Sequence, residues 1–284
     1  MRELTPAARV REALAHTGRG PSRGLSQNFL TDPNILRHIV AAAELPPAAR
    51  VLEIGPGPGT LTAELLLAGA SVVAVELDRG LAAYLSEEFA GDAVTVVEGD
   101  ILKVDLEALA PHGFTHVVAN LPYAITSPCL RLLCGRPQRV ERAVLTVQRE
   151  LAERIRCGPG SRVRGSLGVL VQRVFAVKIV RIVPPTAFMP RPKVDSAVLR
   201  LAPVTDPGSS SLEDFESVLR AAFGQRRKTL RNALASGPER WPPEWVGAML
   251  AAAGLTGSER AEEVSGRQFE QMCEAICALR GVDA

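Results

Sequence analysis

A glycine-rich loop between an expected strand and an expected helix constrains the fold of this chain more than any other feature. The loop Gly55-Pro-Gly-Pro-Gly59 follows the apolar stretch 51–54 and precedes a helical stretch over about 60–68. Glycine lets a backbone turn tightly and approach a ligand closely, and the first strand–helix turn of an open α/β sheet is where a nucleotide-like ligand binds. Thr60 stands where the dinucleotide-binding fingerprint has its third glycine, so the loop indicates a nucleotide-type ligand but not a dinucleotide.

Strand-like and helix-like stretches alternate around this loop. Asp32 and Pro33 form an expected N-cap and first position of a helix that runs to about residue 44. The other elements are expected as strands at 71–76, 93–98, 115–119, 143–148, 168–174, 178–183 and 197–201, with helices over 81–89 and 150–156. Such alternation predicts a parallel sheet that is covered by helices on both faces.

The composition changes at Pro203-Val-Thr-Asp-Pro-Gly-Ser-Ser-Ser211, which has the character of a linker. Beyond it the pattern is helical, with helices expected over 212–223, 228–235, 243–252 and 266–279. We therefore expect a polar N-terminal segment (1–24), an α/β domain (25–203) and a small all-helical C-terminal domain (204–284).

Two carboxylates are expected at the same sheet edge as the glycine loop. Glu76 ends the second strand, where a carboxylate can accept hydrogen bonds from both ribose hydroxyls. Asp100 follows the third strand, and Ile101 comes next, a pairing that suits an adenine amine and the face of its ring. A lone acid at a strand end is usually only solvated, but the two acids and the loop together favour an adenosine-containing cofactor.

The tetrapeptide Asn120-Leu-Pro-Tyr123 follows the fourth expected strand, at this same edge. The amine of adenine is a poor nucleophile because its lone pair is delocalised into the ring. The Asn120 side-chain oxygen and the Leu121 carbonyl can accept two hydrogen bonds from that amine and free the lone pair, while Pro122 stiffens the turn. Tyr123 offers a ring for stacking a base, worth about 1–3 kcal/mol. The motif indicates methylation of an adenine amine, a reaction that depends more on orientation than on acid–base chemistry.

The basic residues are concentrated in two segments although the net charge is only +2. Of 33 basic residues 29 are Arg. The segment from Arg131 to Arg173 contains ten Arg and only three Glu. Five basic residues and no acid lie between Arg220 and Arg231. Concentrated arginine suits a phosphate backbone, but from charge alone a solvated face is an equally good interpretation.

Several classes of protein are disfavoured by composition. No apolar run approaches the ~18 residues of a membrane span, and the N-terminus lacks the apolar run of a secretory signal. The five cysteines are odd in number and form no CxxC pair; Cys273 and Cys277 alone would be half a metal site. We expect a soluble intracellular monomer with no metal and no disulfide.

The glycine loop, the two acids and Asn120–Tyr123 together resemble the ribosomal RNA adenine N6,N6-dimethyltransferase family over nearly the whole chain. That resemblance implies a Rossmann-like class I methyltransferase fold with a small helical C-terminal domain, and S-adenosylmethionine as methyl donor. The segment Phe188-Met-Pro-Arg-Pro-Lys-Val-Asp-Ser196 resembles the family's F-x-P-x-P-x-V-x-S, which implies that Phe188 is a second aromatic wall opposite Tyr123. From the residues alone, a core phenylalanine is the simpler interpretation of Phe188. The cofactor-binding positions that the resemblance implies are Asn28, Leu30, Gly55, Gly57, Glu76, Asp100, Ile101 and Asn120.

Two C-terminal stretches, 225–234 and 260–265, resemble the housekeeping small-subunit enzymes of the family. This implies dimethylation of two adjacent adenosines in a loop near the 3′ end of 16S rRNA, on the immature 30S subunit in the cytoplasm, and a role in small-subunit biogenesis. It also implies an N-terminal segment close to the RNA, and RNA contacts by Arg226, Arg227, Lys228 and Arg231. Two departures from the family pattern, Ser26 for glycine and Arg164-Gly-Ser-Leu-Gly168 for Tyr-Gly-x-Leu-Ser, affect local loop geometry and not the reaction.

Three other functions compete with this interpretation. A ribosome-assembly or transcription factor with a methyltransferase fold has no need of the intact Asn120–Tyr123 site. An NAD-type oxidoreductase is disfavoured by Thr60 and by a motif that has no role in hydride transfer. A large-subunit resistance methyltransferase is disfavoured by the two C-terminal stretches.

Overall fold

The computed structural model describes residues 2–18, 20–22, 24, 27–109, 113–135 and 140–282, so that Ser26 lies outside the described residues. The chain divides into two compact units. The first comprises Met1–Ala152 with Val177–Pro203, and the second comprises Glu153–Ala176 with Val204–Ala284. Residues 153–176 therefore group with the helical C-terminal part, although the sequence placed them in the α/β domain.

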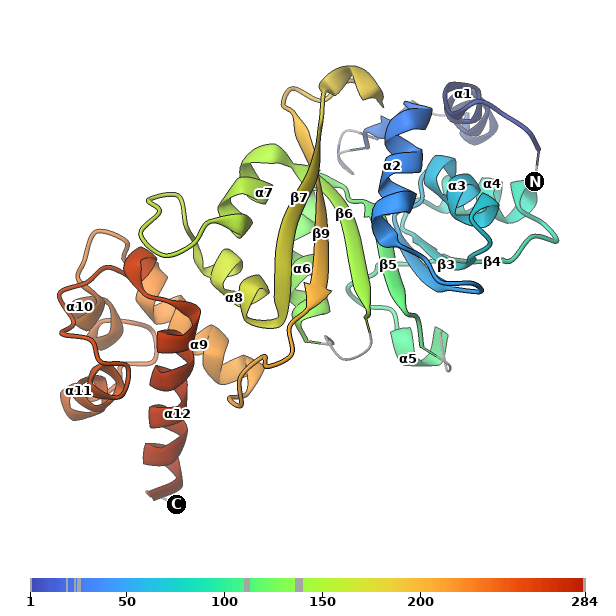
Figure 1. The fold of residues 1–284 in the computed structure, drawn as a ribbon. Helices are drawn as coiled ribbons and strands as arrows, with labels where there is room; N and C mark the ends of the chain where they lie inside the picture. Colours follow the sequence, from blue (N-terminus) through green and yellow to red (C-terminus); the bar gives the residue numbers. More distant parts are fainter. Residues whose placement is uncertain are drawn as a thin grey trace. The chain divides into compact units, whose positions relative to one another are not determined.

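A sheet that is seven-stranded among the described residues forms the centre of the first unit (Figure 1). Its order is β4-β3-β2-β5-β6-β9-β7. The parallel strands are β2 (Arg50–Ile54), β3 (Ser71–Glu76), β4 (Val94–Glu98), β5 (His116–Asn120) and β6 (Arg142–Gln148). β9 (Ser196–Pro203) runs antiparallel to β6, and β7 (Phe175–Val183) forms the edge. The observed sheet is therefore mostly parallel, as expected. The antiparallel strand β9 was not indicated by the strand–helix alternation.

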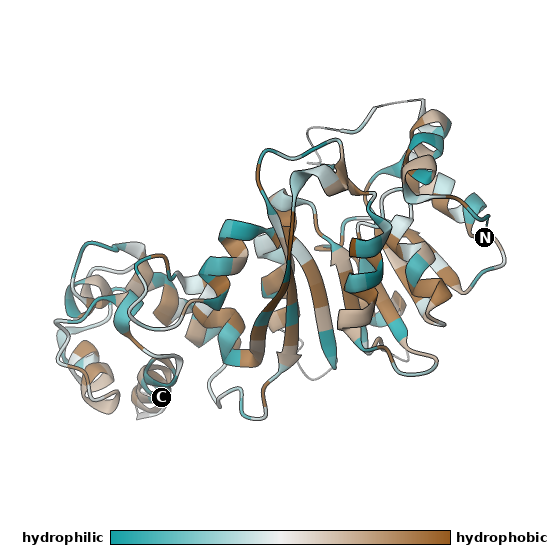
Figure 2. Ribbon diagram, turned by 45° about the horizontal axis from the view of Figure 1, so that its top comes forward, coloured by the Kyte–Doolittle hydropathy of each residue, from teal (hydrophilic) through white to brown (hydrophobic). Residues whose placement is uncertain are grey.

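Both faces of the inner strands of this sheet are buried, as the strand–helix alternation predicted, whereas the edge strands β4 and β7 are largely half-buried or exposed. Val51, Val118 and Val144 pack into a core with α2 (Pro33–Ala43) and α3 (Thr60–Leu67). The next residue along each strand is equally buried on the opposite face, as Leu52 and Leu145 show. Apolar colour accordingly covers much of the strands in Figure 2. Four other helices of the described part of this unit are α1 (Pro6–Thr17), α4 (Arg79–Glu88), α5 (Leu106–Leu109) and α6 (Thr126–Cys134).

Local sequence signals explain where the helices begin. The Asp32 side chain accepts hydrogen bonds from the backbone of Asn34 and Ile35, with Pro33 at the first helical position, as expected. In α4 the Asp78 carboxylate has the same role. Helix α1 packs on α4, where the buried guanidinium of Arg9 donates to Glu88 over 2.7 Å.

The second unit is built from helices. α9 (Leu212–Gly224), α10 (Leu230–Ala235), α11 (Pro243–Ala252) and α12 (Gly266–Val282) confirm the four helices expected beyond the linker. The strand expected at 168–174 is wrong, because this stretch belongs to helix α8 (Ser166–Val174). A short apolar run does not distinguish a strand from a buried helix, and here packing against α9 decides, with Val169, Leu170, Val171 and Val174 buried.

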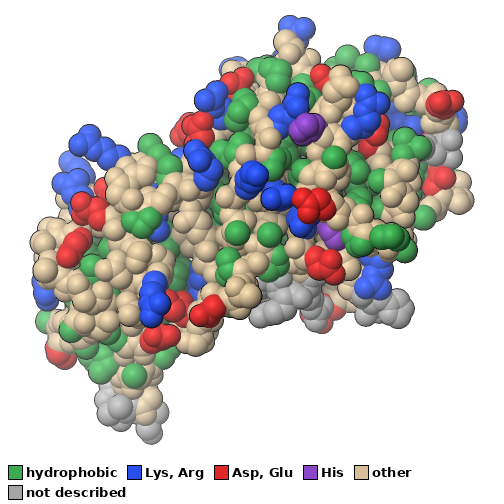
Figure 3. Space-filling model, viewed as in Figure 1, with side chains coloured by type: hydrophobic (Ala, Val, Ile, Leu, Met, Phe, Trp, Pro, Cys, Tyr) green, Lys and Arg blue, Asp and Glu red, His purple; other side chains and the backbone are tan. Residues whose placement is uncertain are grey.

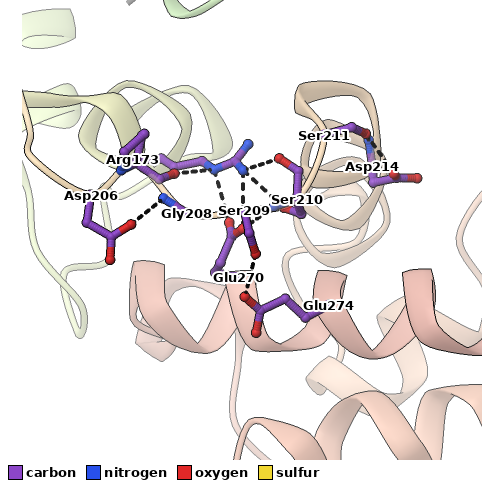
Figure 4. Close-up of polar contacts among 10 residues, drawn as sticks. Arg173, Asp206, Gly208, Ser209, Ser210, Ser211, Asp214, Glu270 and Glu274 are labelled. Atoms are coloured by element: carbon purple, nitrogen blue, oxygen red, sulfur yellow. Dashed lines mark hydrogen bonds and ion pairs between the residues drawn. The ribbon is translucent and has the colours of Figure 1, made fainter.

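The segment that the sequence indicated as a linker is held firmly within the second unit (Figure 4). Arg173 of α8 donates to the Pro207 carbonyl over 2.9 Å and pairs with Glu270 of α12 at 3.0 Å. Glu270 in turn accepts from the Ser210 backbone at 2.7 Å. Gly208 has φ +86°, and a Cβ at this position would collide with the Glu270 carboxyl group. Residues 206–210 are therefore fixed between α8 and α12.

Candidate active site

The carboxyl ends of four parallel strands meet at one edge of the first unit and surround a cavity. Parallel pairing aligns Ile54 with Val75 and Glu76 with Glu98, so the segments that follow these strands lie side by side. The cavity is lined by all twelve residues that the sequence indicated for cofactor and catalysis in this unit: Asn28, Leu30, Gly55, Gly57, Glu76, Asp100, Ile101, Asn120, Leu121, Pro122, Tyr123 and Phe188.

The glycine loop approaches Glu76 closely. Gly57 has φ +59°, and a Cβ there would stand 2.9 Å from the ring of Phe29. The Gly57 backbone donates to one carboxylate oxygen of Glu76 at 2.9 Å, and the Asp78 backbone donates to the other at 2.8 Å. Glu76 is only 6% exposed, and this burial raises the pKa of its carboxyl group despite the two donors. Each oxygen keeps acceptor capacity for a ligand hydroxyl, because a carboxylate oxygen has two lone pairs.

Glu53 lines the same cavity, although the sequence pattern gave it no role. The side chain is 1% exposed and accepts a hydrogen bond from the Thr62 hydroxyl over 2.7 Å. Burial raises the pKa of Glu53 to about 8. The available signal was an acid inside the apolar strand 51–54, directly before the glycine loop.

Asp100 and Ile101 form the part of the cavity wall that follows β4. One oxygen of Asp100 accepts from the Leu102 backbone at 3.0 Å, and the other lies 3.7 Å from the Lys103 ammonium. Ile101 is buried against the cavity. The half-buried Asp100 carboxylate can therefore accept a hydrogen bond from a ring that packs on Ile101.

Asn120 is held in one orientation at the end of β5. Its Nδ2 donates to the Asn28 carbonyl over 2.9 Å, and a carbonyl can only accept, so the amide is oriented with Oδ1 on the other side. Among the described residues no group donates to Oδ1. The Leu121 backbone donates to the Thr146 carbonyl at 3.2 Å, which fixes the turn that follows. Asn28 therefore positions an acceptor of Asn120 within the cavity.

Tyr123 and Phe188 both line the cavity and come from distant parts of the chain. The Tyr123 hydroxyl lies 2.8 Å from the Ser196 hydroxyl, and burial raises the pKa of the phenol. Phe188 belongs to β8 (Phe188–Met189), where it pairs with Leu30 of β1 (Phe29–Leu30), and it is 3% exposed within the apolar core. The segment 188–196 thus contributes an aromatic ring at one end and an anchor for Tyr123 at the other.

The four basic residues expected to contact RNA lie in the second unit, on and after the turn from α9 to α10. All four side chains are exposed. Lys228 donates to the Ser236 hydroxyl at 3.2 Å, and Arg231 donates to the Thr256 carbonyl at 3.0 Å. Arg226 donates to the Arg162 carbonyl at 2.6 Å. In Figure 3 basic side chains gather at the left of the view, over the loops that join α7 (Arg149–Arg156) to α8 and α9 to α10.

Metal-ligand clusters and membrane spans are both absent from the part of the chain that the structure describes. These residues contain no group of three or more His, Cys, Asp or Glu side chains arranged to hold a metal ion. Within the same residues, no helix is both long and apolar enough to cross a membrane.

Known proteins resemble this chain over most of both units. The family described as ribosomal RNA adenine dimethylase matches residues 22–277. The ribosomal RNA small subunit methyltransferase A of Thermosynechococcus vestitus is 45% identical over 260 residues, covering 89% of this chain and 96% of that protein. A solved dimethyladenosine transferase from Plasmodium falciparum has a TM-score of 0.74 at 26% identity, covering 86% of this chain and 95% of that one. The solved 23S rRNA methyltransferase ErmE has a TM-score of 0.65 at 31% identity, and the match covers 88% of this chain and 100% of that one.

Proposed function

Because the chain belongs to the ribosomal RNA adenine dimethylase family, we propose that it dimethylates the N6 amines of two adjacent adenosines near the 3′ end of 16S rRNA. The chain is an S-adenosylmethionine-dependent rRNA methyltransferase with the α/β fold expected for one. The choice of the small subunit is favoured by the relatives at 37–45% identity that carry the name small subunit methyltransferase A.

The orientation of Asn120 is the observation on which the chemistry depends. Since the Asn28 carbonyl holds Nδ2, Oδ1 is an acceptor that is preorganised for the adenine amine. Together with the Leu121 carbonyl it accepts both amine hydrogens, moves the nitrogen toward tetrahedral geometry and directs its lone pair at the methyl group. Such fixed dipoles act where charge develops in the transition state and need no reorganisation. No general base is required to start the transfer, since the lone pair itself attacks the methyl carbon as its bond to sulfur breaks, and the nitrogen then releases one of its protons to water.

The cavity also suits an adenosine-containing methyl donor. Glu76 is fixed by two backbone donors and has lone pairs left for the ribose hydroxyls. Asp100 and Ile101 provide an acceptor for an adenine amine and an apolar contact for its ring. Bound S-adenosylmethionine supplies an activated methyl group on a sulfonium. Glu53, with its pKa raised to about 8, is largely neutral at pH 7 and keeps the negative charge of the cavity low.

Tyr123 and Phe188 act as the two walls that hold the target base out of its stack. Aromatic faces bind an unstacked base by about 1–3 kcal/mol each, and an enzyme that modifies a base atom takes the base out of the helix. Ser196 fixes the hydroxyl end of Tyr123 and so limits how the ring turns.

The RNA is the immature small-subunit particle, which meets the second unit at the stretch that contains Arg226, Arg227, Lys228 and Arg231, and the N-terminal segment lies near the RNA. This proposal includes action as a monomer in the cytoplasm and a role in small-subunit biogenesis. Mass spectrometry of rRNA from cells with and without the gene tests it. We expect dimethyladenosine at two adjacent small-subunit positions only when the gene is present. Methylation of large-subunit RNA alone would instead favour the resistance-type activity.

A further inference from the structure

Two stretches that are distant in sequence are attached to one exposed loop of the second unit. This loop, residues 158–164, joins α7 to α8. Its Gly160 backbone donates to the Glu262 carbonyl over 2.9 Å, which attaches it to the turn before α12. The Arg226 guanidinium donates to the carbonyls of Arg162 and Arg164, at 2.6 and 3.4 Å, which attaches it to the turn after α9.

The buried Arg164 side chain attaches the C-terminal end of the loop to the turn before α12. This side chain is 1% exposed and donates to the Val264 carbonyl, with a longer contact of 3.4 Å to the Glu262 carbonyl. The Arg164 backbone also closes a turn onto the Ser161 carbonyl at 3.0 Å. The 158–164 loop is therefore held in one conformation by the Arg226 side chain and by the backbone carbonyls of Glu262 and Val264, so it loses little conformational entropy when it binds a partner.

The held loop presents a cation and an apolar side chain to solvent. Arg162 is exposed, and Val163 next to it is 52% exposed. Arg227 is exposed on the supporting turn, and the Nη2 atom of Arg154 lies 3.4 Å from where a Cβ of Gly165 would stand. Within the described part of the chain, neither Arg162 nor Arg227 forms an ion pair with a carboxylate. Unneutralised arginines on a fixed loop suit a polyanion.

We propose that the 158–164 loop is an RNA-contacting element, in which Arg162 binds a phosphate and Val163 packs on the exposed edge of a ribose or base. Arg226 is a positioning residue that acts through this loop, since its hydrogen bonds already serve two loop carbonyls. The wide, shallow minor groove of RNA offers phosphates and sugar edges together, which matches a paired cation and apolar side chain. This inference rests on the proposed function only in taking rRNA as the substrate.

The test measures binding to small-subunit particles from cells that lack the gene, as a function of salt concentration. Arg162→Ala should weaken binding and lower the slope of log affinity against log salt by about 0.7–0.9, the value for one phosphate contact. Val163→Ser should weaken binding and leave that slope unchanged. Arg267→Ala is the matched control, because it removes the same charge from another position of the same unit.

A double-mutant cycle tests the role of Arg226. If Arg226 acts through the loop, Arg226→Ala combined with Arg162→Ala weakens binding little more than the larger single change. If the two arginines made independent phosphate contacts, the fold-losses in affinity would multiply in the double variant. The slope of log affinity against log salt would then fall by about twice the value for one contact, which would overturn the positioning role. Arg226→Lys, which keeps the charge but lacks the guanidinium Nη2 atom that donates to both carbonyls, should behave like Arg226→Ala in affinity.

The outcomes separate this inference from the function on which it rests. If the unaltered protein methylates the particles but Arg162→Ala binds with the affinity and slope of Arg267→Ala, the loop is not an RNA contact. If the unaltered protein neither binds nor methylates them, both proposals fail. Weaker binding to an acidic protein partner with unchanged binding to RNA would assign the loop to that other class of partner and overturn the inference.

Discussion

The cavity of the first unit and the basic surface of the second unit hold their polar groups in opposite ways. In the cavity two of the expected side chains are fixed by backbone groups: Glu76 by two N–H donors and Asn120 by the Asn28 carbonyl. At the basic surface, defined by the 158–164 loop and residues 225–231, side chains fix the backbone, as Arg226 does for two loop carbonyls. The cavity is therefore suited to recognise its ligands by fixed geometry. The basic surface is suited to recognise RNA by the positive charge that a well-ordered loop carries.

This difference predicts different sensitivities. Interactions in a buried site with few net charges change little with salt, whereas exposed arginine–phosphate contacts are screened and weaken steeply. Substitutions in the cavity should therefore affect the methyl-transfer rate or the cofactor. Substitutions on the basic surface should affect RNA affinity and its salt dependence.

The largest expected effect is that of Asn120→Ala. It removes the oriented acceptor, and loss of one preorganised electrostatic contact typically lowers kcat by about 10²–10³-fold. RNA affinity should stay within about twofold, because the basic surface is untouched. Methyl transfer is measured with labelled cofactor, and Asn34→Ala, an exposed asparagine of the same unit, is the control. Full activity in Asn120→Ala would contradict the proposed mechanism.

The second effect concerns the basic surface. Replacing Arg226, Arg227 and Lys228 together by Ala should weaken RNA binding by at least about tenfold and flatten its salt dependence by roughly 0.7–0.9 of slope per lost phosphate contact. At saturating RNA the rate of methyl transfer should recover. If the slope is unchanged, this stretch is a solvated face, which charge alone had left as an equal alternative.

The third effect returns to the cavity, at Gly57. A Cβ at this position would stand 2.9 Å from the Phe29 ring, and the backbone has φ +59°. Gly57→Ala should therefore displace the loop and lower cofactor affinity by roughly tenfold, equivalent to about 1.4 kcal/mol, as measured by calorimetry. Gly69→Ala is a matched control with φ +81° and no atom within 4 Å of the added Cβ. Equal losses in both would mean that backbone strain, not contact with Phe29, is the cause.

Local signals in the sequence predicted much of the first unit. The glycine loop, the Asp32 cap and the alternation of strands and helices each depend on neighbouring residues, and the structure has a mostly parallel sheet whose inner strands are buried on both faces. Nine of the twelve expected residues reach one cavity because the parallel strands β2 to β5 carry their carboxyl ends to the same edge. The other three, Asn28, Leu30 and Phe188, reach it through the separate antiparallel pair of β1 and β8 and the residue before it.

Interactions across long sequence separations could not be predicted in this way. The hydroxyls of Tyr123 and Ser196 meet across 73 positions, and Arg226 reaches the Arg162 carbonyl across 64. Stretch 168–174 was misjudged as a strand for the same reason, since packing on α9 and not local pattern decides its helix. Glu53 was visible as an acid in an apolar strand, but its neighbour Thr62 follows only from the fold.

The last expected effect is on stability, and it tests how the cavity tolerates its buried acids. Glu53 has a pKa of about 8 in the folded protein, against 4.5 for an unperturbed carboxyl. The folded state therefore binds more protons between these values, so the free energy of unfolding falls as pH rises from about 4.5 to 8. Below that window the group is neutral in both states and has no effect, and above it the full cost of burying the charge remains.

Glu53→Gln removes this titration and keeps the shape of the side chain. The free energy of unfolding of the variant relative to the unaltered protein should be lowest near pH 5, rise toward pH 8 and level off above it. The rise is up to about 1.4 kcal/mol for each tenfold difference in proton affinity between the folded and unfolded states. Urea unfolding at several pH values measures it. Glu150→Gln, an exposed change of equal charge, is the control. A difference that does not vary with pH would mean that Glu53 is ionised in the folded cavity, and the low negative charge proposed for the cavity would then be wrong.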